Sequence, residues 1–130
     1  MLKNNTYLTI STAGLIEIKK FDPLNDDVND VIHAALDSYY EIVRCRTLPH
    51  KFLMLVDDCG VLKSLPVNAL ASELYGVRVH GCPICGPAVI MREDMVDGEP
   101  DIVGLTEDDT AELVRILRGL FVIREVNDNE

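Results

Sequence analysis

Apolar and polar residues alternate at the start of the chain with the period of a β-strand, and the period then changes to that of a helix. Residues 6–11 and 15–20 are two β-rich runs joined by a short Thr-Ala-Gly connection, which predicts a hairpin. From Leu24 to Leu36 apolar residues recur every three or four positions, and this spacing predicts an amphipathic helix.

The rest of the chain continues with short strands and helices. Residues 39–46 and 52–56 have strand character, and Pro66 stands at the first position of a second helix. Residues 94–100 have the composition of a polar loop. A last helix is expected to begin at Thr106, where Asp109 completes an approximate capping box. A closing strand is expected over residues 121–126.

This order of elements predicts an α+β fold. Strands and helices are interspersed without strict βαβ alternation, which favours a largely antiparallel sheet with about three helices. A chain of 130 residues has the usual size of one domain, so residues 1–130 are expected to form a single domain. The opening order of hairpin, helix and hairpin would suit a β-grasp-like arrangement.

The sequence carries no sign of a membrane or secretory segment. The first nine residues are polar and mixed, and no apolar run approaches the ~20 residues that span a bilayer. We therefore expect a cytoplasmic protein. Its four cysteines are then interpreted as small buried thiols or metal ligands rather than disulfides.

Charge is distributed unevenly along this acidic chain, whose formal net charge is -10. Residues 21–39 hold five acids and no Lys or Arg, and residues 93–115 hold nine acids against one base. Such a surface repels nucleic acid and anionic membranes, so neither is an expected partner. Between the acidic segments, residues 40–56 contain three bases and one acid, and this region is able to hold an anion.

The basic segment supplies the candidate ligand site. In a strand over residues 39–46, Arg44 and Arg46 project from the same face, and two guanidinium groups at that spacing can bind a phosphate or a carboxylate. The candidate ligand-binding residues are Arg44, Arg46, His50, Lys51, Asn68, Arg78, His80 and Arg92. Two alternatives stay open. The arginines can form the polar face of an edge strand, and Asn68 can bond to the local backbone.

A Cys-Pro-x-Cys-Gly string raises the possibility of structural zinc. Cys82 and Cys85 are spaced so that both thiolates can reach one ion. A structural site needs four ligands, and the others would have to come from isolated Cys and His residues. The alternative is that the two cysteines are ordinary loop and core residues, in which case no cofactor is expected.

Motifs of catalysis are missing from the sequence. It contains no glycine-rich phosphate loop and no nucleophile elbow. Cys45 and His50 could form a nucleophile–base pair, but nothing in the sequence supplies an orienting group or oxyanion donors. We therefore expect a protein that is not an enzyme.

Several short stretches beyond residue 39 recur in one known family in the same order and spacing. They are Tyr40-Glu41-Ile42-Val43, Asp58 with Gly60, Leu65-Pro66-Val67-Asn68, Leu74-Tyr75-Gly76, Ile84-Cys85-Gly86-Pro87-Ala88-Val89-Ile90 and Leu105-Thr106-Glu107-Asp108-Asp109. Through them the chain resembles the uncharacterised family known as domain of unknown function 3846, found in phages, plasmids and gut bacteria. The resemblance implies a small accessory protein of a phage or mobile element, in the host cytoplasm, and no metal role for Cys82.

Two classes of function are consistent with these features. The first is a binding module that holds a small anionic, nucleotide-like ligand on a basic strand face, as a counter-defence protein would to sequester a nucleotide immune signal. The second is an acidic protein–protein inhibitor or DNA mimic that uses the first helix and residues 93–109 against a basic host protein. A small structural-zinc protein is the third alternative, and a homo-oligomer is compatible with each.

Overall fold

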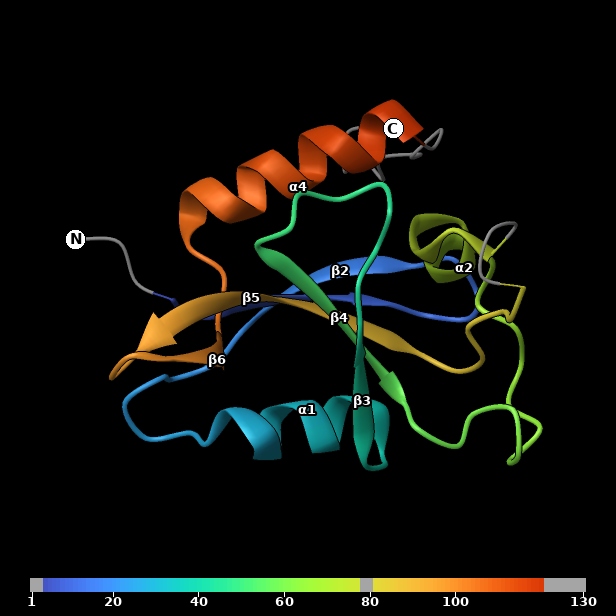
Figure 1. The fold of residues 1–130 in the computed structure, drawn as a ribbon, viewed down its shortest axis with the longest axis horizontal. Helices are drawn as coiled ribbons and strands as arrows, with labels where there is room; N and C mark the ends of the chain where they lie inside the picture. The colour runs from blue at the N-terminus through green and yellow to red at the C-terminus, as the bar shows by residue number, and fades with distance from the viewer. Residues whose placement is uncertain (1–3, 78–80, 121–130) are drawn as a thin grey trace, which may run out of the picture.

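A central sheet with helices on both faces organises the molecule in the computed structural model, which describes residues 4–77 and 81–120 (Figure 1). In chain order the elements are β1 (Thr6–Ile10), β2 (Ile16–Lys20), α1 (Val28–Leu36), β3 (Tyr40–Val43), β4 (Phe52–Asp57), α2 (Ala69–Tyr75), β5 (Ala88–Val96), β6 (Glu99–Val103) and α4 (Glu107–Leu120). The predicted α+β class, with an antiparallel sheet and three helices, is confirmed.

The sheet has six strands in the order β2-β1-β5-β4-β3, and β6 pairs with β5 beside this path. All of these strand pairs are antiparallel. The expected order of hairpin, helix and hairpin is present as β1-β2, α1 and β3-β4. β5 lies at the centre, while β2 and β3 form the two ends of the strand order.

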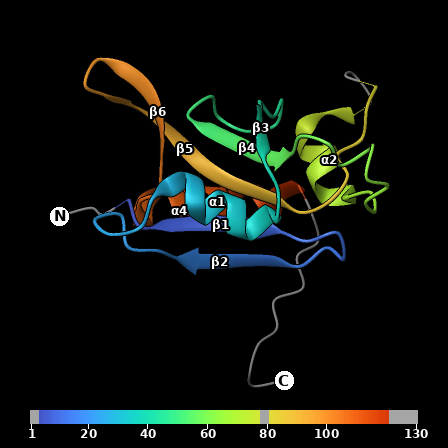
Figure 2. The same ribbon diagram turned by 90° about the horizontal axis from the view of Figure 1, so that it is seen from below.

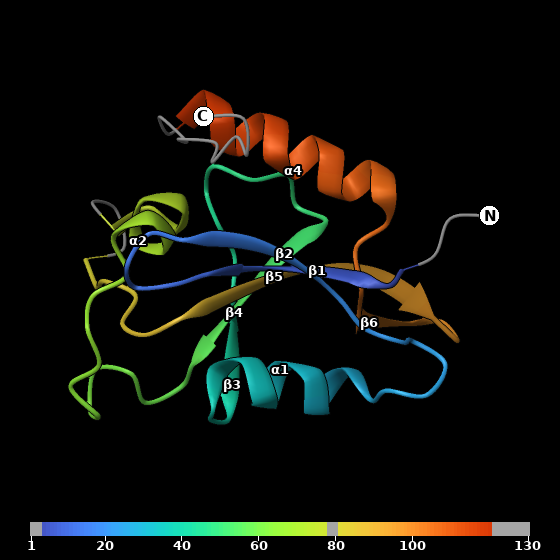
Figure 3. The ribbon, with the colours of Figure 1, turned by 180° about the vertical axis from the view of Figure 1, so that it is seen from behind.

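The two faces of the sheet carry separate apolar clusters. Leu8, Ile90 and Leu113 belong to the cluster on the face covered by α4 and α2, and Ile32 and Val89 belong to the cluster under α1 (Figures 2 and 3). Because successive residues of a strand point to opposite faces, a strand covered on both sides needs apolar residues at every position. This explains the uninterrupted Ala-Val-Ile-Met run of β5.

Several expected boundaries were wrong. α1 begins at Val28 and not at Leu24, and α2 begins at Ala69 and not at Pro66. Two further differences affect the candidate site. The strand expected over residues 39–46 ends at Val43. Residues 94–100, expected to be a loop, form most of the β5–β6 hairpin, whose turn contains Asp97 and Gly98 with φ of 52° and 82°. Two successive residues with positive φ give the turn twist that matches a tight hairpin. The strand expected over residues 121–126 lies outside the described residues.

Helix starts follow from local side-chain capping. Asp27 accepts from the backbone at the start of α1, and Asn68 does so at α2. At α4 the predicted capping box is confirmed, because Thr106 Oγ1 accepts from the Asp109 N–H and an Asp109 carboxylate oxygen accepts from the Thr106 N–H, each at 3.0 Å. Within the described ranges, each helix is too short or too polar to cross a membrane.

Candidate functional site

The basic segment does not form the open strand face that its sequence predicted. Since β3 ends at Val43, Arg44 and Arg46 follow the strand and do not share one of its faces. One Arg44 guanidinium nitrogen lies 2.9 Å from a Glu93 carboxylate oxygen, and another donates to the His50 carbonyl at 2.6 Å. The charge of Arg44 is therefore already paired within the protein.

Lys51 and Arg92 are also paired, through the start of α4. Arg92 lies 2.8 Å from Asp109, and the Lys51 ammonium lies 3.4 Å from Asp109 and 2.6 Å from Glu112. The Asp109 side chain is only 2% exposed. Burial by itself would raise the pKa of Asp109, but hydrogen bonds from the Thr106 backbone and from Arg92 outweigh burial and hold this pKa below its usual range.

Arg46 and His50 are exposed, and His50 contacts the paired cations through its backbone carbonyl, which accepts from Arg44. Arg46 is exposed, and among the described residues it has no ion pair. Its aliphatic stem lies against Gly76, where an added Cβ would come within 2.9 Å of the Arg46 Cδ. Gly76 ends α2 with a φ of 93°, so a side chain at this position would be both strained and crowded.

Asn68 has a structural role that excludes it from an open ligand site. Its side chain is fully buried. Its amide nitrogen donates to the carbonyls of Ile10 at 2.9 Å and Gly86 at 3.0 Å, and its amide oxygen caps α2 through the Ala71 N–H at 3.1 Å. The alternative of a bond to the local backbone is present in the Ala71 contact, and the ligand role of Asn68 stays a prediction for which the buried side chain offers no exposed polar atom. Arg78 and His80 lie outside the described residues.

The cysteines are dispersed. Cys82 is exposed, Cys85 is half-buried and Cys45 is buried. In the stretches 4–77 and 81–120, no group of three or more His, Cys, Asp or Glu residues could hold a metal ion. Burial raises the pKa of Cys45 to about 12, so this thiol is protonated at neutral pH and is a poor nucleophile for a pair with His50.

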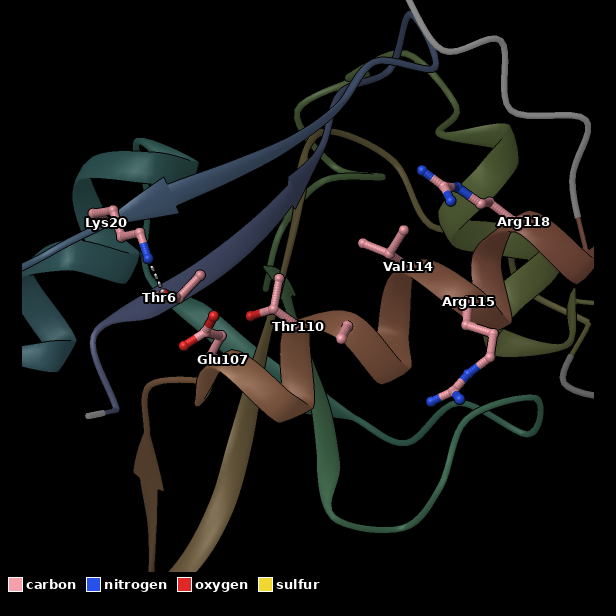
Figure 4. A pocket seen from close by; sticks show the side chains of 8 residues that line it. Thr6, Lys20, Glu107, Thr110, Val114, Arg115 and Arg118 are labelled. Atoms are coloured by element: carbon pink, nitrogen blue, oxygen red, sulfur yellow. Dashed lines mark hydrogen bonds between the residues drawn. The ribbon is translucent and has the colours of Figure 1, made fainter. Parts of the chain in front are cut away.

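A different set of cations borders a groove of about 660 Å³ between α4 and the strands β1 and β2. We call it the α4–β2 groove. Its lining consists of Thr6, Lys20, Glu107, Thr110, Ala111, Val114, Arg115 and Arg118. Figure 4 shows Lys20 on the strand side, Val114 directed toward the strands, and Arg115 directed away from them.

The polar groups of this groove are partly committed to the protein. Lys20 donates to the Thr6 hydroxyl at 3.2 Å, and that hydroxyl donates to Asn5 at 3.0 Å. The Thr110 hydroxyl donates to the Thr106 carbonyl at 2.9 Å. Both hydroxyl hydrogens are donated within the protein, so the charged side chains that border the groove are Lys20, Arg115, Arg118 and Glu107.

Sequence reasoning missed this groove. Glu107, Thr110, Ala111, Val114 and Arg118 recur every three or four residues, so they were recognisable as one stripe of the last helix. The missing information was that this stripe faces Lys20, which is distant in sequence. No local sequence pattern encodes the position of this stripe opposite Lys20.

An acidic surface forms where the start of α1 meets β6. The Tyr40 hydroxyl donates to Asn29 of α1 at 2.6 Å. Burial, followed by the charges of Asp101 on β6 and Asp27 at the cap of α1, raises the pKa of Tyr40. The two acidic segments of the sequence therefore lie close enough for their fields to overlap at one tyrosine.

Comparisons with known proteins add no relatives to this description. No protein-family model matches the chain, and neither curated proteins nor solved structures give a match. The resemblance to domain of unknown function 3846 therefore stays a prediction.

Proposed function

We propose that this protein is a non-enzymatic binding module that holds a small organic anion in the α4–β2 groove. The observation that carries this proposal is the gathering of three cationic side chains and, among the described residues, a single carboxylate around a cavity of about 660 Å³, on a chain whose net charge is -10. On so acidic a molecule, a local excess of positive charge attracts an anionic ligand and leaves the rest of the surface repulsive to it.

Size and lining support a ligand with both charged and apolar parts. A volume of about 660 Å³ lies within the range of ~300–1,000 Å³ that is usual for small-molecule sites. Ala111 and Val114 offer apolar contact between the cations. A nucleotide has this combination of a flat base and an anionic phosphate, which keeps nucleotide-like ligands first among the candidates.

Binding without conversion is supported by the groups of the groove. Among the described residues its lining includes no His or Cys, and its two threonine hydroxyls donate to protein acceptors. Sequestration of a nucleotide signal in counter-defence is the role that such binding would serve if the chain belongs to the phage-borne family that it resembles.

Isothermal titration tests the proposal. Wild type is titrated with a nucleoside monophosphate, the matching triphosphate, a cyclic dinucleotide and the uncharged nucleoside. Lys20→Gln is expected to weaken binding of a phosphate-bearing ligand by about tenfold, the usual loss for one charge-assisted contact. The matched control is Arg46→Gln, which removes an exposed cation outside the groove and is expected to leave affinity unchanged.

The outcomes separate the two candidate locations. Loss of binding in Arg46→Gln together with normal binding in Lys20→Gln would place the ligand on the basic segment instead. Binding of the uncharged nucleoside as tightly as the phosphates, or no binding by wild type, would end the anion proposal.

A second candidate function rests on the acidic surface around Tyr40. The charges of Asp101 and Asp27, which both act on Tyr40, favour a basic protein as partner, because carboxylates from two elements create a stronger field than either segment alone. Capture of a basic host protein on immobilised chain should decline as salt screens these charges. Asp30 lies in the first turn of α1, so its replacement leaves the Asp27 cap in place. Asp101→Asn combined with Asp30→Asn should weaken capture, and unchanged capture would contradict this candidate.

A further inference from the structure

β2 forms an end of the sheet, and within the described residues no strand pairs with its outer side. Figure 2 shows it along the rim of the molecule. Each residue from Ile16 to Lys20 has a partner in β1, in unbroken register and without proline. Many sheet edges are protected by bulges or prolines that prevent a further strand from pairing. β2 has neither.

The phase of the β1–β2 ladder determines which backbone groups of β2 point outward. Ser11 N–H donates to the Leu15 carbonyl and Phe21 N–H donates to the Asn5 carbonyl, both at 2.9 Å. In an antiparallel pair, hydrogen-bonded positions alternate along the strand, so the odd-numbered residues of β2 bond to β1. The N–H and C=O groups of Ile16, Ile18 and Lys20 therefore point outward.

The side chains of β2 separate by face. Ile18 is paired with Leu8 of the α4-side core and is 50% exposed. Glu17 and Lys19 are exposed on the opposite, α1 side. Within the described part of the chain neither of these two charges has an ion pair. Along the strand, the negative Glu17 and the positive Lys19 therefore precede and follow Ile18, which is half-exposed on the other face.

We propose that β2 pairs with β2 of a second copy of this chain, antiparallel and centred on Ile18. In this register the outward groups of Ile16, Ile18 and Lys20 meet the same groups of the partner. Glu17 lies opposite Lys19 of the partner subunit, and the exchange occurs twice because the two-fold axis makes both contacts equivalent. The occupant of the edge is therefore a second copy, selected by charge complementarity.

The register is specified by charge. The pair Glu17–Lys19 occupies a non-hydrogen-bonded position, where facing Cα atoms lie only ~4.5 Å apart and side chains interact most closely. Moving the centre by one residue in either direction places Glu17 opposite Glu17, or Lys19 opposite Lys19. The other terminal strand, β3, has the sequence Tyr-Glu-Ile-Val with no cation, so it lacks this self-complementarity.

The proposed pairing keeps the two sheets continuous. An antiparallel edge-to-edge pair has its two-fold axis perpendicular to the sheet, so both α4 helices lie on the same face. The two α4–β2 grooves then lie on the same face of one continuous sheet that contains both β2 strands. Dimer formation does not depend on the proposed ligand and is tested without it.

Sedimentation equilibrium of the full chain over a concentration series tests the inference. Glu17→Lys and Lys19→Glu are each expected to weaken self-association by at least about tenfold, because each replaces two attractive cross-strand pairs by two repulsive ones. The double variant Glu17→Lys/Lys19→Glu restores complementarity and is expected to return within about threefold of wild type.

The design separates local pairing from net charge. Glu17→Lys makes the chain less acidic and Lys19→Glu makes it more acidic, so a general charge effect would move the two variants in opposite directions. Glu41→Lys on β3 is the matched control and should associate like wild type or slightly better. Circular dichroism checks that each variant is folded, which exposure of these side chains leads us to expect.

Two results would overturn the inference. One is a monomer at every concentration, as would follow if residues 121–130 of the same chain occupied the edge. The other is a dimer that both single substitutions leave intact, which would place the interface elsewhere.

Discussion

Cationic side chains gather both around the basic segment and in the α4–β2 groove, but the partners of these cations differ between the two regions. Around the basic segment, Arg44, Lys51 and Arg92 each lie within 3.4 Å of a carboxylate. In the groove, Lys20 donates to a neutral hydroxyl, and Glu107 is the only carboxylate in the part of the lining that the structure describes. One helix, α4, borders both regions.

This difference in partners determines whether a cation of the folded protein can bind a ligand. A guanidinium that faces a buried carboxylate cannot exchange that partner for a ligand without leaving a charge unpaired in the interior, which costs several kcal/mol. Lys20 in the groove donates to a neutral hydroxyl, so a ligand that replaces this contact leaves no buried carboxylate unpaired. The first region therefore stabilises the fold, and the second is the region where binding is proposed.

The largest loss of stability is expected when the ion pairs around Asp109 are removed. Asp109→Ala removes the carboxylate that holds Arg92 and the acceptor that caps α4, and should lower the free energy of unfolding by about 3–5 kcal/mol. Urea unfolding measures it. Asp108→Ala, an exposed neighbour in the same helical turn, is the control and should change stability by less than ~0.5 kcal/mol. Equal effects of the two substitutions would contradict a structural role for the Asp109 network.

A slightly smaller effect is expected at Asn68, which was first interpreted as a ligand residue. Asn68→Ala leaves the buried carbonyls of Ile10 and Gly86 without donors and removes the cap of α2, so stability should fall by about 2–3 kcal/mol. Thermal unfolding measures the loss. Ligand affinity of the folded fraction should be unchanged, and a loss of affinity with normal stability would return Asn68 to the site.

An intermediate loss of stability is expected when the pH is lowered. The pKa of Asp109 is lowered in the folded protein from its model-compound value of 3.8. A carboxylate with a depressed folded pKa contributes stability above its unfolded pKa, and that contribution disappears as pH falls through the folded value. Wild type should therefore lose stability below about pH 4, as urea unfolding across a pH series would show.

The Asp109→Asn variant isolates this contribution. Because it cannot titrate, its stability should change less steeply with pH below about pH 4 than that of wild type. A residual slope is expected from Asp57, whose pKa is also lowered: burial opposes ionisation there, but the hydrogen bonds from Lys63, the Cys59 backbone and Ser38 together outweigh it. Identical slopes in both proteins would show that Asp109 does not titrate differently on folding.

The smallest stability effect is expected in the groove. Lys20→Gln should change the free energy of unfolding by less than ~0.5 kcal/mol, because an exposed surface cation contributes little to stability. The same variant is the one expected to weaken anion binding. A large loss of stability would mean that Lys20 belongs with the structural charges, and the contrast between the two regions would disappear.

Much of the fold was predictable because it depends on local periodicity. The hairpin of residues 6–20, the amphipathic α1 and the capping box at Thr106 follow from alternation, helical spacing and short-range hydrogen bonds. The β5–β6 hairpin was missed because residues 94–100, which include several acids, have the composition of a loop. Their strand conformation depends on pairing, which begins at Arg92 and Val103.

The candidate site was much less predictable. Arg44 and Arg46 were grouped because a strand was expected to continue to residue 46, and its end at Val43 removed the geometric basis of that grouping. The charges of Lys51 and Arg92 were visible in the sequence, but their shared partner Asp109 is separated from them by many residues.

The amino-acid sequence by itself determined the α+β class, the acidic character of the chain and the positions of most helices, because these depend on residue type and on neighbours a few positions away. The tertiary structure decided which cations are neutralised and which border a cavity. That distinction depends on contacts between segments that are distant in sequence. A difference of a few ångströms decides whether a cation forms an ion pair, and no local sequence pattern records such distances.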